Sequence, residues 1–224
     1  MIDGILNIDK PAQMTSHDVV DRVRKKFKMR RVGHAGTLDP LATGVLVVLL
    51  GKATKLSNQL TDLDKGYKAK LLLGVRTDTL DIDGKTVKES PVDITQEQFE
   101  QALEKYRGTI NQMVPMYSAV KVNGRKLYEY ARQGMDVERP IRRVSISKLE
   151  LINFESPYAE IMVHCSKGTY IRQLAEDIGN DLGCGACIAA LRRTHSGEFD
   201  IAQAITLEDI NENSVRDWEA YKTH

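Results

Sequence analysis

One carboxylate stands out in this sequence because of its surroundings. Residues 33–44 read GHAGTLDPLATG and lead into an apolar run, so Asp39 lies in a glycine-punctuated loop before a buried strand. Pro40 fixes its own φ and biases Asp39 toward an extended conformation, while Gly36 and Gly44 allow backbone geometry that other residues resist. Such a loop could hold a catalytic carboxylate rigidly. The alternative is a structural turn in which Asp39 caps its own backbone.

A basic segment precedes this loop. Residues 22–31 contain seven cationic side chains, Arg31 among them, and no acidic one, although the net charge of the 224-residue chain is only +1. These cations could hold phosphate groups near Asp39, and the alternative is a solvated helix face. Acidic residues gather at 78–104 and after residue 198. This polarity favours a polyanionic partner.

Aromatic and imidazole side chains complete the set of candidate residues. His34 lies in the same loop as Asp39, and Tyr67 and Tyr170 follow at a distance in the sequence. A base extruded from an RNA stack needs a flat side chain to receive it, cations for its phosphates and one positioned catalytic group. The candidate residues therefore suit work on a nucleobase.

Other chemistries fail on spacing. A phosphate-binding loop is excluded because Ala53 stands where a magnesium-binding hydroxyl is required, and a calcium loop because Ser90 replaces the final Glu. Cys184 and Cys187 form a single C-x-x-C pair, and a zinc site would need two more well-placed donors. We therefore predict no metal and interpret the pair as buried thiols at the entry to a short helix.

The elements that must position these residues follow from local patterns. Apolar spacing after a Thr15 capping box predicts a helix, and Thr95 begins another. Asn123-Gly124 predicts a hairpin turn, and Thr206 to Asp209 a terminal helix. Strands are predicted at residues 5–8, 45–50, 68–75, 145–154 and 159–165, with a helix at 171–182. This order lacks regular βαβ alternation and predicts an α+β fold with a mixed, mostly antiparallel sheet flanked by helices and loops.

Composition sets the wider expectations. The chain is long enough to bury a large core, and its three cysteines with no apolar signal stretch indicate a reduced cytoplasmic setting. The longest apolar run has six residues, far short of a membrane span. We expect a cytoplasmic protein without a membrane partner.

At this point the sequence resembles the TruB family of pseudouridine synthases, the bacterial enzymes that modify position 55 of tRNA. The resemblance is ordered and covers most of residues 3–195. It rests on the segments 4–11, 33–44, 51–55, 64–67, 73–81, 116–121, 126–132, 164–172 and 191–193.

The resemblance implies roles for the reacting residues. Asp39 matches the catalytic aspartate, which is ionised at neutral pH and helps to detach uracil from ribose and rejoin it through C5. Whether it attacks the sugar, attacks the base or abstracts a ribose proton stays open. Tyr67 matches the tyrosine that stacks on the flipped base and is a candidate for handling the C5 proton. Arg172 matches the arginine that pairs with the aspartate.

The resemblance also implies the substrate contacts. Tyr170 matches a pocket residue and Leu191 its apolar wall, and His34 matches the histidine that enters the disrupted RNA stack. Lys10, before Pro11, matches a motif that braces the active-site loop, and Lys55 is a phosphate contact. Arg31 belongs to the basic segment, which would contact the T arm.

The function implied is isomerisation of uridine to pseudouridine in the tRNA T loop, without cofactor or metal, by a monomer. Two alternatives are a guide-RNA-dependent catalytic subunit, and a tRNA-binding or tRNA-folding protein whose catalysis is dispensable. We expect a catalytic domain at residues 1–205, a short acidic tail at 206–224 that forms a helix, and none of the C-terminal RNA-binding PUA domain that the family normally carries.

Overall fold

The computed structural model describes residues 2–221 and divides the chain into two compact units. Unit 1 contains the residues up to Tyr67 and those from Leu191 onward, and unit 2 contains residues 68–190. Two strands, β4 (Lys65–Leu73) and β12 (Ala186–Ser196), begin in one unit and end in the other. Within residues 2–221 no helix has the length and apolarity needed to cross a membrane.

Unit 1 is built on strand β3. The six residues 45–50 are completely buried, and β1 pairs with β3 in antiparallel register, with Ile5 opposite Leu49. A strand covered on both faces reads as a continuous apolar run, which is why the sequence predicted it correctly. The elements of this unit are β1 (Gly4–Lys10), α1 (Ser16–Phe27), β2 (Val32–Ala35), β3 (Thr43–Leu50), the 3-10 helix η1 (Gly51–Leu56), α2 (Ser57–Thr61) and β13 (Phe199–Asp200).

Helix α1 begins and ends as its sequence predicts. Thr15 and Asp18 form the reciprocal capping box, and Val19, Val20 and Val23 are buried. Lys28 ends the helix in the left-handed conformation, with φ of 52°. The basic segment therefore starts on the exposed face of α1 and continues into the loop before β2.

The C-terminal segment corrects one prediction. The Thr206 hydroxyl caps Asp209 as expected, but no α-helix follows within the described residues; the chain forms the 3-10 turns η3 (Glu212–Ser214) and η4 (Glu219–Tyr221). Trp218 packs into the hydrophobic core of unit 1, and Arg216 bridges to Ile5 of β1. The segment is thus held by β1 and the core, which replaces the internal hydrogen bonds of a helix. Residues 222–224, the end of the predicted tail, lie outside the described residues.

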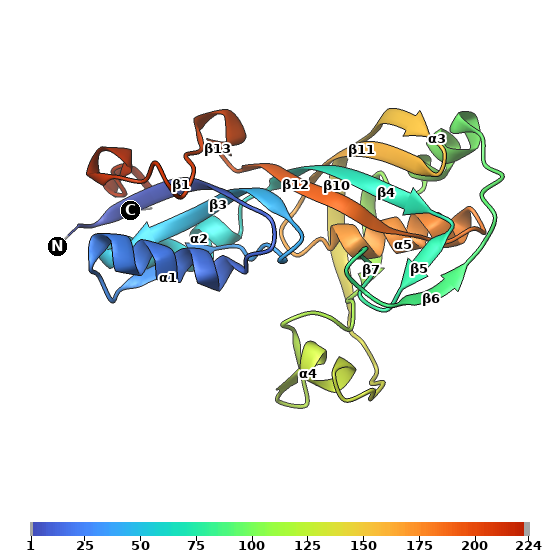
Figure 1. Cartoon of the computed structure of the whole chain (residues 1–224), viewed down its shortest axis with the longest axis horizontal. Coiled ribbons are helices and arrows are strands. Elements are labelled where there is room, and N and C mark those ends of the chain that lie inside the picture. Colours follow the sequence, from blue (N-terminus) through green and yellow to red (C-terminus); the bar gives the residue numbers. More distant parts are fainter. Residues whose placement is uncertain (1, 222–224) are drawn as a thin grey trace. The chain divides into compact units, whose positions relative to one another are not determined.

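Unit 2 is also a sheet with helices. Strand β10 pairs antiparallel with β11 on one side and with β7 on the other, and α5 buries Leu174, Ala175 and Ile178. The insertion between β7 and β10, which carries α4, forms a lobe beside this sheet (Figure 1). The elements are β5 (Val75–Thr77), β6 (Thr86–Glu89), α3 (Gln96–Glu104), β7 (Gly108–Met113), β8 (Lys121–Val122), β9 (Arg125–Lys126), α4 (Leu127–Ala131), β10 (Ile141–Glu155), β11 (Tyr158–Cys165) and α5 (Ile171–Asp181).

Two further outcomes concern the cysteines and the strand order. Cys165, Cys184 and Cys187 are buried thiols, but the C-x-x-C pair leads into strand β12 and not into a helix. Glycines at 183 and 185 with positive φ turn the chain from α5 into that strand. The strand pairs with a described register are mostly antiparallel, and β12 pairs with β3 in parallel, which confirms the α+β class and the mixed sheet.

Candidate active site

The Asp39 loop joins β2 to β3 in unit 1. Asp39 is half-buried, and the loop begins and ends at glycines with left-handed φ, 85° at Gly36 and 99° at Gly44. A Cβ atom at Gly44 would lie 2.2 Å from the Arg193 carbonyl oxygen, so only glycine fits there. The loop is therefore defined by backbone geometry as well as by Pro40.

Buried polar groups hold the middle of this loop. The Ser16 hydroxyl accepts a hydrogen bond from the Leu38 amide at 2.8 Å and donates to the Leu38 carbonyl at 3.1 Å. The Asp39 carbonyl accepts from the Ala42 amide at 3.1 Å, and the Pro40 carbonyl from the Gln13 amide at 2.9 Å. Because these bonds fix the residues on both sides of Asp39, its carboxylate is carried by an ordered backbone.

Lys10 also lies against the loop. Its side chain is fully buried at the end of β1 and donates to the carbonyl oxygens of Met14 at 2.6 Å, Pro11 at 2.9 Å and Pro40 at 3.3 Å. Burial lowers the pKa of Lys10 to about 8, while the Asp39 carboxylate acts in the opposite direction. This geometry supports the bracing role that the sequence suggested for Lys10.

Tyr67 and Leu191 contribute buried side chains to the same unit. Tyr67 lies on β4 and is 9% exposed, and Leu191 lies on β12 and is 8% exposed. The Leu191 carbonyl accepts a hydrogen bond from the Thr43 hydroxyl at 3.5 Å, just after the Asp39 loop. Unit 1 therefore contains the predicted stacking tyrosine and the predicted apolar wall together with Asp39.

His34 and the basic segment share a pocket of about 480 Å³ in unit 1. The Arg31 guanidinium at its wall donates to the Thr54 hydroxyl at 2.8 Å. Burial, and then the charges of Arg193 and His17, lower the pKa of His34, which keeps its ring neutral at neutral pH. The basic and imidazole side chains around the pocket are His17, Arg24, Arg30, Arg31 and His34. Exposed Lys55 lies on η1 and does not line this pocket.

Tyr170 and Arg172 lie in unit 2, at the start of α5. The Gln112 side chain, 1% exposed, accepts from the Tyr170 amide at 2.8 Å and donates to the Tyr170 carbonyl at 3.0 Å. This pair of bonds fixes the backbone of the N-cap residue, whose own side chain makes no cap bond. The first turn of α5 is thereby held against β7.

Arg172 is held by two segments of unit 2. Its side chain donates to the Thr79 carbonyl at 2.7 Å and the Tyr117 carbonyl at 2.9 Å, and its Nε lies 3.8 Å from the Asp81 carboxylate. Arg172 is 6% exposed and Asp81 is 7% exposed. A buried guanidinium needs such acceptors on every side, and their arrangement fixes the direction of the side chain.

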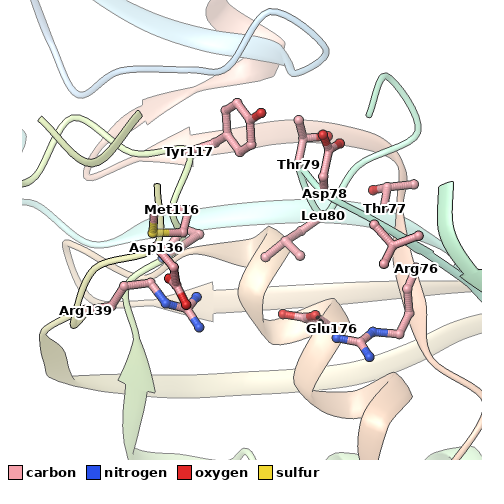
Figure 2. A pocket seen from close by; sticks show the side chains of 12 residues that line it. Arg76, Thr77, Asp78, Thr79, Leu80, Met116, Tyr117, Asp136, Arg139 and Glu176 are labelled. Carbon is pink, nitrogen blue, oxygen red and sulfur yellow. Dashed lines mark hydrogen bonds and ion pairs between the residues drawn. The ribbon is translucent and has the colours of Figure 1, made fainter. Parts of the chain in front are cut away.

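A pocket of about 230 Å³ adjoins these acceptors, with Thr79 and Tyr117 among its lining residues. Figure 2 shows Glu176 turned toward the Arg76 guanidinium, which it meets at 2.8 Å. Arg139 adds a second cation, while Asp78 and Asp136 add carboxylates. The mixed charge selects no single class of ion, and the pocket's clearest contribution is to border the Arg172 network.

The predicted site residues are thus divided between the units. Unit 1 contains Asp39, Tyr67, Leu191, Lys10, His34, Arg31 and Lys55, and unit 2 contains Tyr170 and Arg172. Sequence reasoning missed three buried polar residues that hold these groups: Ser16, Gln112 and Arg193. No local pattern could have found Arg193, because its neighbours Arg192, Thr194 and His195 are polar and only partly buried.

Comparison with known proteins gives a consistent result. Residues 24–171 match the profile of the TruB family pseudouridylate synthase N-terminal domain, and residues 172–222 match the tRNA pseudouridylate synthase B C-terminal domain. The tRNA pseudouridine synthase B of Azoarcus sp. is 52% identical over 94% of this chain and 70% of its own length. That of Pseudomonas aeruginosa is 50% identical over 93% of this chain and 69% of its own length.

Solved structures agree. The chain superimposes on a protein in the crystal structure of a Cbf5-Nop10-Gar1 complex with a TM-score of 0.77 and 31% identity, over 96% of this chain and 60% of that one. A protein in the structure of an H/ACA RNP bound to a substrate RNA containing 2′-deoxyuridine superimposes with a TM-score of 0.71 and 29% identity, over 96% of this chain and 56% of that one. The chain thus spans less than two thirds of these structural relatives. Sequence profile, curated relatives and fold together show that the chain belongs to the TruB family of pseudouridylate synthases.

Proposed function

We propose that this protein isomerises uridine to pseudouridine in the T loop of tRNA, at position 55. The observation that carries the proposal is the Asp39 loop, in which hydrogen bonds hold the backbone on both sides of one carboxylate. Membership of the TruB family supports the reaction, and the curated relatives, named tRNA pseudouridine synthase B, support the substrate.

The reaction is an isomerisation, so its atoms balance within one nucleotide. The N1–C1′ bond of uridine breaks, a C5–C1′ bond forms, and the proton on C5 is replaced by one on N1. Asp39 supplies the carboxylate for this exchange, and a pre-ordered loop spares the reaction the reorganisation that a flexible carboxylate would require. The proposal needs no cofactor or metal.

The remaining residues bind the extruded nucleotide and its neighbours. Tyr67 stacks on the flipped base and handles the C5 proton, while Tyr170 and Leu191 form the walls of its pocket. Neutral His34 enters the RNA stack, since an uncharged imidazole stacks without losing the hydration of a cation. Arg31 and exposed Lys55 hold phosphates of the T stem-loop.

Arg172 is proposed to pair with Asp39. The two residues belong to different units, and the support for the pairing is the family resemblance. A guanidinium beside the carboxylate would keep it ionised and oriented. We further propose that the protein acts as a monomer.

Site-resolved mapping of pseudouridine on an unmodified tRNA tests the proposal. The purified protein alone should modify the T-loop uridine, and Asp39→Ala should remove the activity while tRNA binding persists. Asp93→Ala, which changes an exposed carboxylate of unit 2, is the matched control and should keep wild-type activity. An Asp39→Ala protein with full activity would contradict the assignment.

The same experiment separates the two alternatives. Modification of free tRNA without any added RNA excludes a guide-dependent subunit. If Asp39→Ala is inactive but still accelerates tRNA folding, the protein has an added role as an RNA-folding factor, because base flipping already requires it to disrupt pairing and stacking.

A further inference from the structure

Arg193 is a buried cation for which the proposed reaction gives no reason. It lies on β12, is 1% exposed, and is among the largest fully buried side chains of the protein. Within residues 2–221 no carboxylate pairs with it, and its hydrogen-bond partners are backbone carbonyls. Burying a guanidinium without a counter-ion is unfavourable, so the fold retains it here for a particular set of acceptors.

Those acceptors lie at the two ends of the Asp39 loop. One terminal nitrogen of Arg193 donates to the Gly36 carbonyl at 3.1 Å, and the other donates to the Thr37 carbonyl at 3.4 Å. Its Nε donates to the Val45 carbonyl at 2.7 Å, just beyond the loop. One planar side chain therefore ties the chain before Asp39 to the chain after it.

The main chain of Arg193 holds the loop a second time. Arg193 is in parallel register with Gly44, and Arg192 with Thr43, where β12 pairs with β3. The close approach at Gly44 leaves no room for a Cβ atom beside the Arg193 carbonyl. The backbone and the side chain of one residue thus fix both ends of a short loop.

The hydrogen bonds around Asp39 become continuous when Arg193 is included. Every backbone carbonyl of residues 36–40 accepts a hydrogen bond. The carbonyls of residues 36 and 37 accept from the Arg193 side chain, and that of residue 38 accepts from the Ser16 hydroxyl. The carbonyl of residue 39 accepts from the Ala42 amide, and that of residue 40 accepts from the Gln13 amide and the Lys10 side chain. Arg193 is the member of this set that anchors the loop to β12, the strand that also carries Leu191.

We propose that Arg193 is a positioning residue for the isomerisation, which clamps both ends of the Asp39 loop and so fixes the direction of the catalytic carboxylate. The inference rests on the proposed function. Lysine cannot replace this arginine, because a single ammonium group cannot reach acceptors on both sides of the loop in the planar fork of a guanidinium.

The test compares Arg193→Lys with Arg192→Lys in the full chain. Both changes retain the charge and lie on the same strand, but Arg192 is half-exposed and pairs with Asp9 at 2.7 Å. Steady-state kinetics on tRNA should show kcat lowered about 10²-fold in Arg193→Lys, with KM within about twofold of wild type. Arg192→Lys should keep wild-type kcat. Hydrogen exchange should accelerate at residues 36–42 of Arg193→Lys only.

Each outcome decides the inference. An active wild type with a fully active Arg193→Lys would overturn it and leave the proposed function intact, whereas an inactive wild type would overturn the proposed function and the inference with it. A higher KM with an unchanged kcat in Arg193→Lys would also contradict a positioning role. If exchange accelerated equally throughout β1 and β3, Arg193 would merely stabilise the unit, and the inference would fail.

Discussion

In unit 1 the proposed catalytic group, Asp39, lies on a loop whose backbone carbonyls accept hydrogen bonds from buried side chains, whereas in unit 2 Arg172 lies in a helix and its own side chain donates to carbonyls of other segments. The loop needs external donors because its carbonyls have no regular secondary-structure partners. The helix already orders its backbone, so only the side chain needs fixing. Substitutions of the residues that hold these groups should therefore lower kcat more in unit 1 and lower the free energy of unfolding more in unit 2.

The largest effect is expected from Arg172→Met. This change removes the buried guanidinium that faces the Asp81 carboxylate and donates to the Thr79 and Tyr117 carbonyls, and should lower the free energy of unfolding by about 3 kcal/mol or more. Urea unfolding followed by circular dichroism measures it. Arg76→Met removes the partly exposed pair with Glu176 and should cost at most about 1 kcal/mol. Equal losses of unfolding free energy in Arg172→Met and Arg76→Met would contradict the difference expected between a buried and a partly exposed arginine.

Gln112→Leu should have the next largest effect. The Tyr170 amide would lose its acceptor, and the Tyr170 carbonyl would keep only the Leu174 amide as a donor, so the loss of two hydrogen bonds should lower the free energy of unfolding by about 2 kcal/mol. Because α5 retains its own hydrogen bonds, kcat measured on the folded protein should change little. A large fall in kcat without a loss of stability would show that unit 2, too, depends on fine positioning.

Ser16→Ala, in unit 1, should affect kcat more than it affects stability. It removes both hydrogen bonds at Leu38 and should cost about 1 kcal/mol of stability, while kcat falls about tenfold because the backbone beside Asp39 is released. Ser147→Ala, at an exposed hydroxyl of β10, serves as the control for both measurements. A stability loss larger than that of Gln112→Leu, with kcat unchanged, would reverse the proposed contrast.

The last prediction concerns Lys10 and is expressed as a change of stability with pH. Burial lowers its pKa from 10.5 to about 8, so between these values the unfolded chain binds more protons than the folded one. Wild-type stability relative to Lys10→Met should therefore rise with pH across this window, by at most about 1.4 kcal/mol per pH unit. Urea unfolding of both proteins at the two ends of the window measures the difference. If the stability of the wild type relative to Lys10→Met fell with rising pH, the Asp39 carboxylate would raise the pKa of Lys10 by more than burial lowers it.

Local sequence was enough for the elements with strong patterns. The Thr15 and Thr95 capping boxes, the apolar run of β3 and the Asn123-Gly124 hairpin all formed as predicted. Strand β12 was missed because its arginines and histidine interrupt the apolar pattern, although one of them, Arg193, is buried. The terminal helix was wrong because contacts with β1 and the core determine that segment, and a capping signal cannot report such contacts.

The sequence by itself determined the Asp39 loop, the basic helix before it and the ordered motifs that identify the family. The tertiary structure decided how that loop is held. The Arg193 side chain reaches carbonyls 148 to 157 residues away, and Gln112 reaches Tyr170 across 58 residues. Such pairs arise only when strands pack side by side, and residue spacing along the chain encodes periodicity within an element but not which buried donor meets which carbonyl.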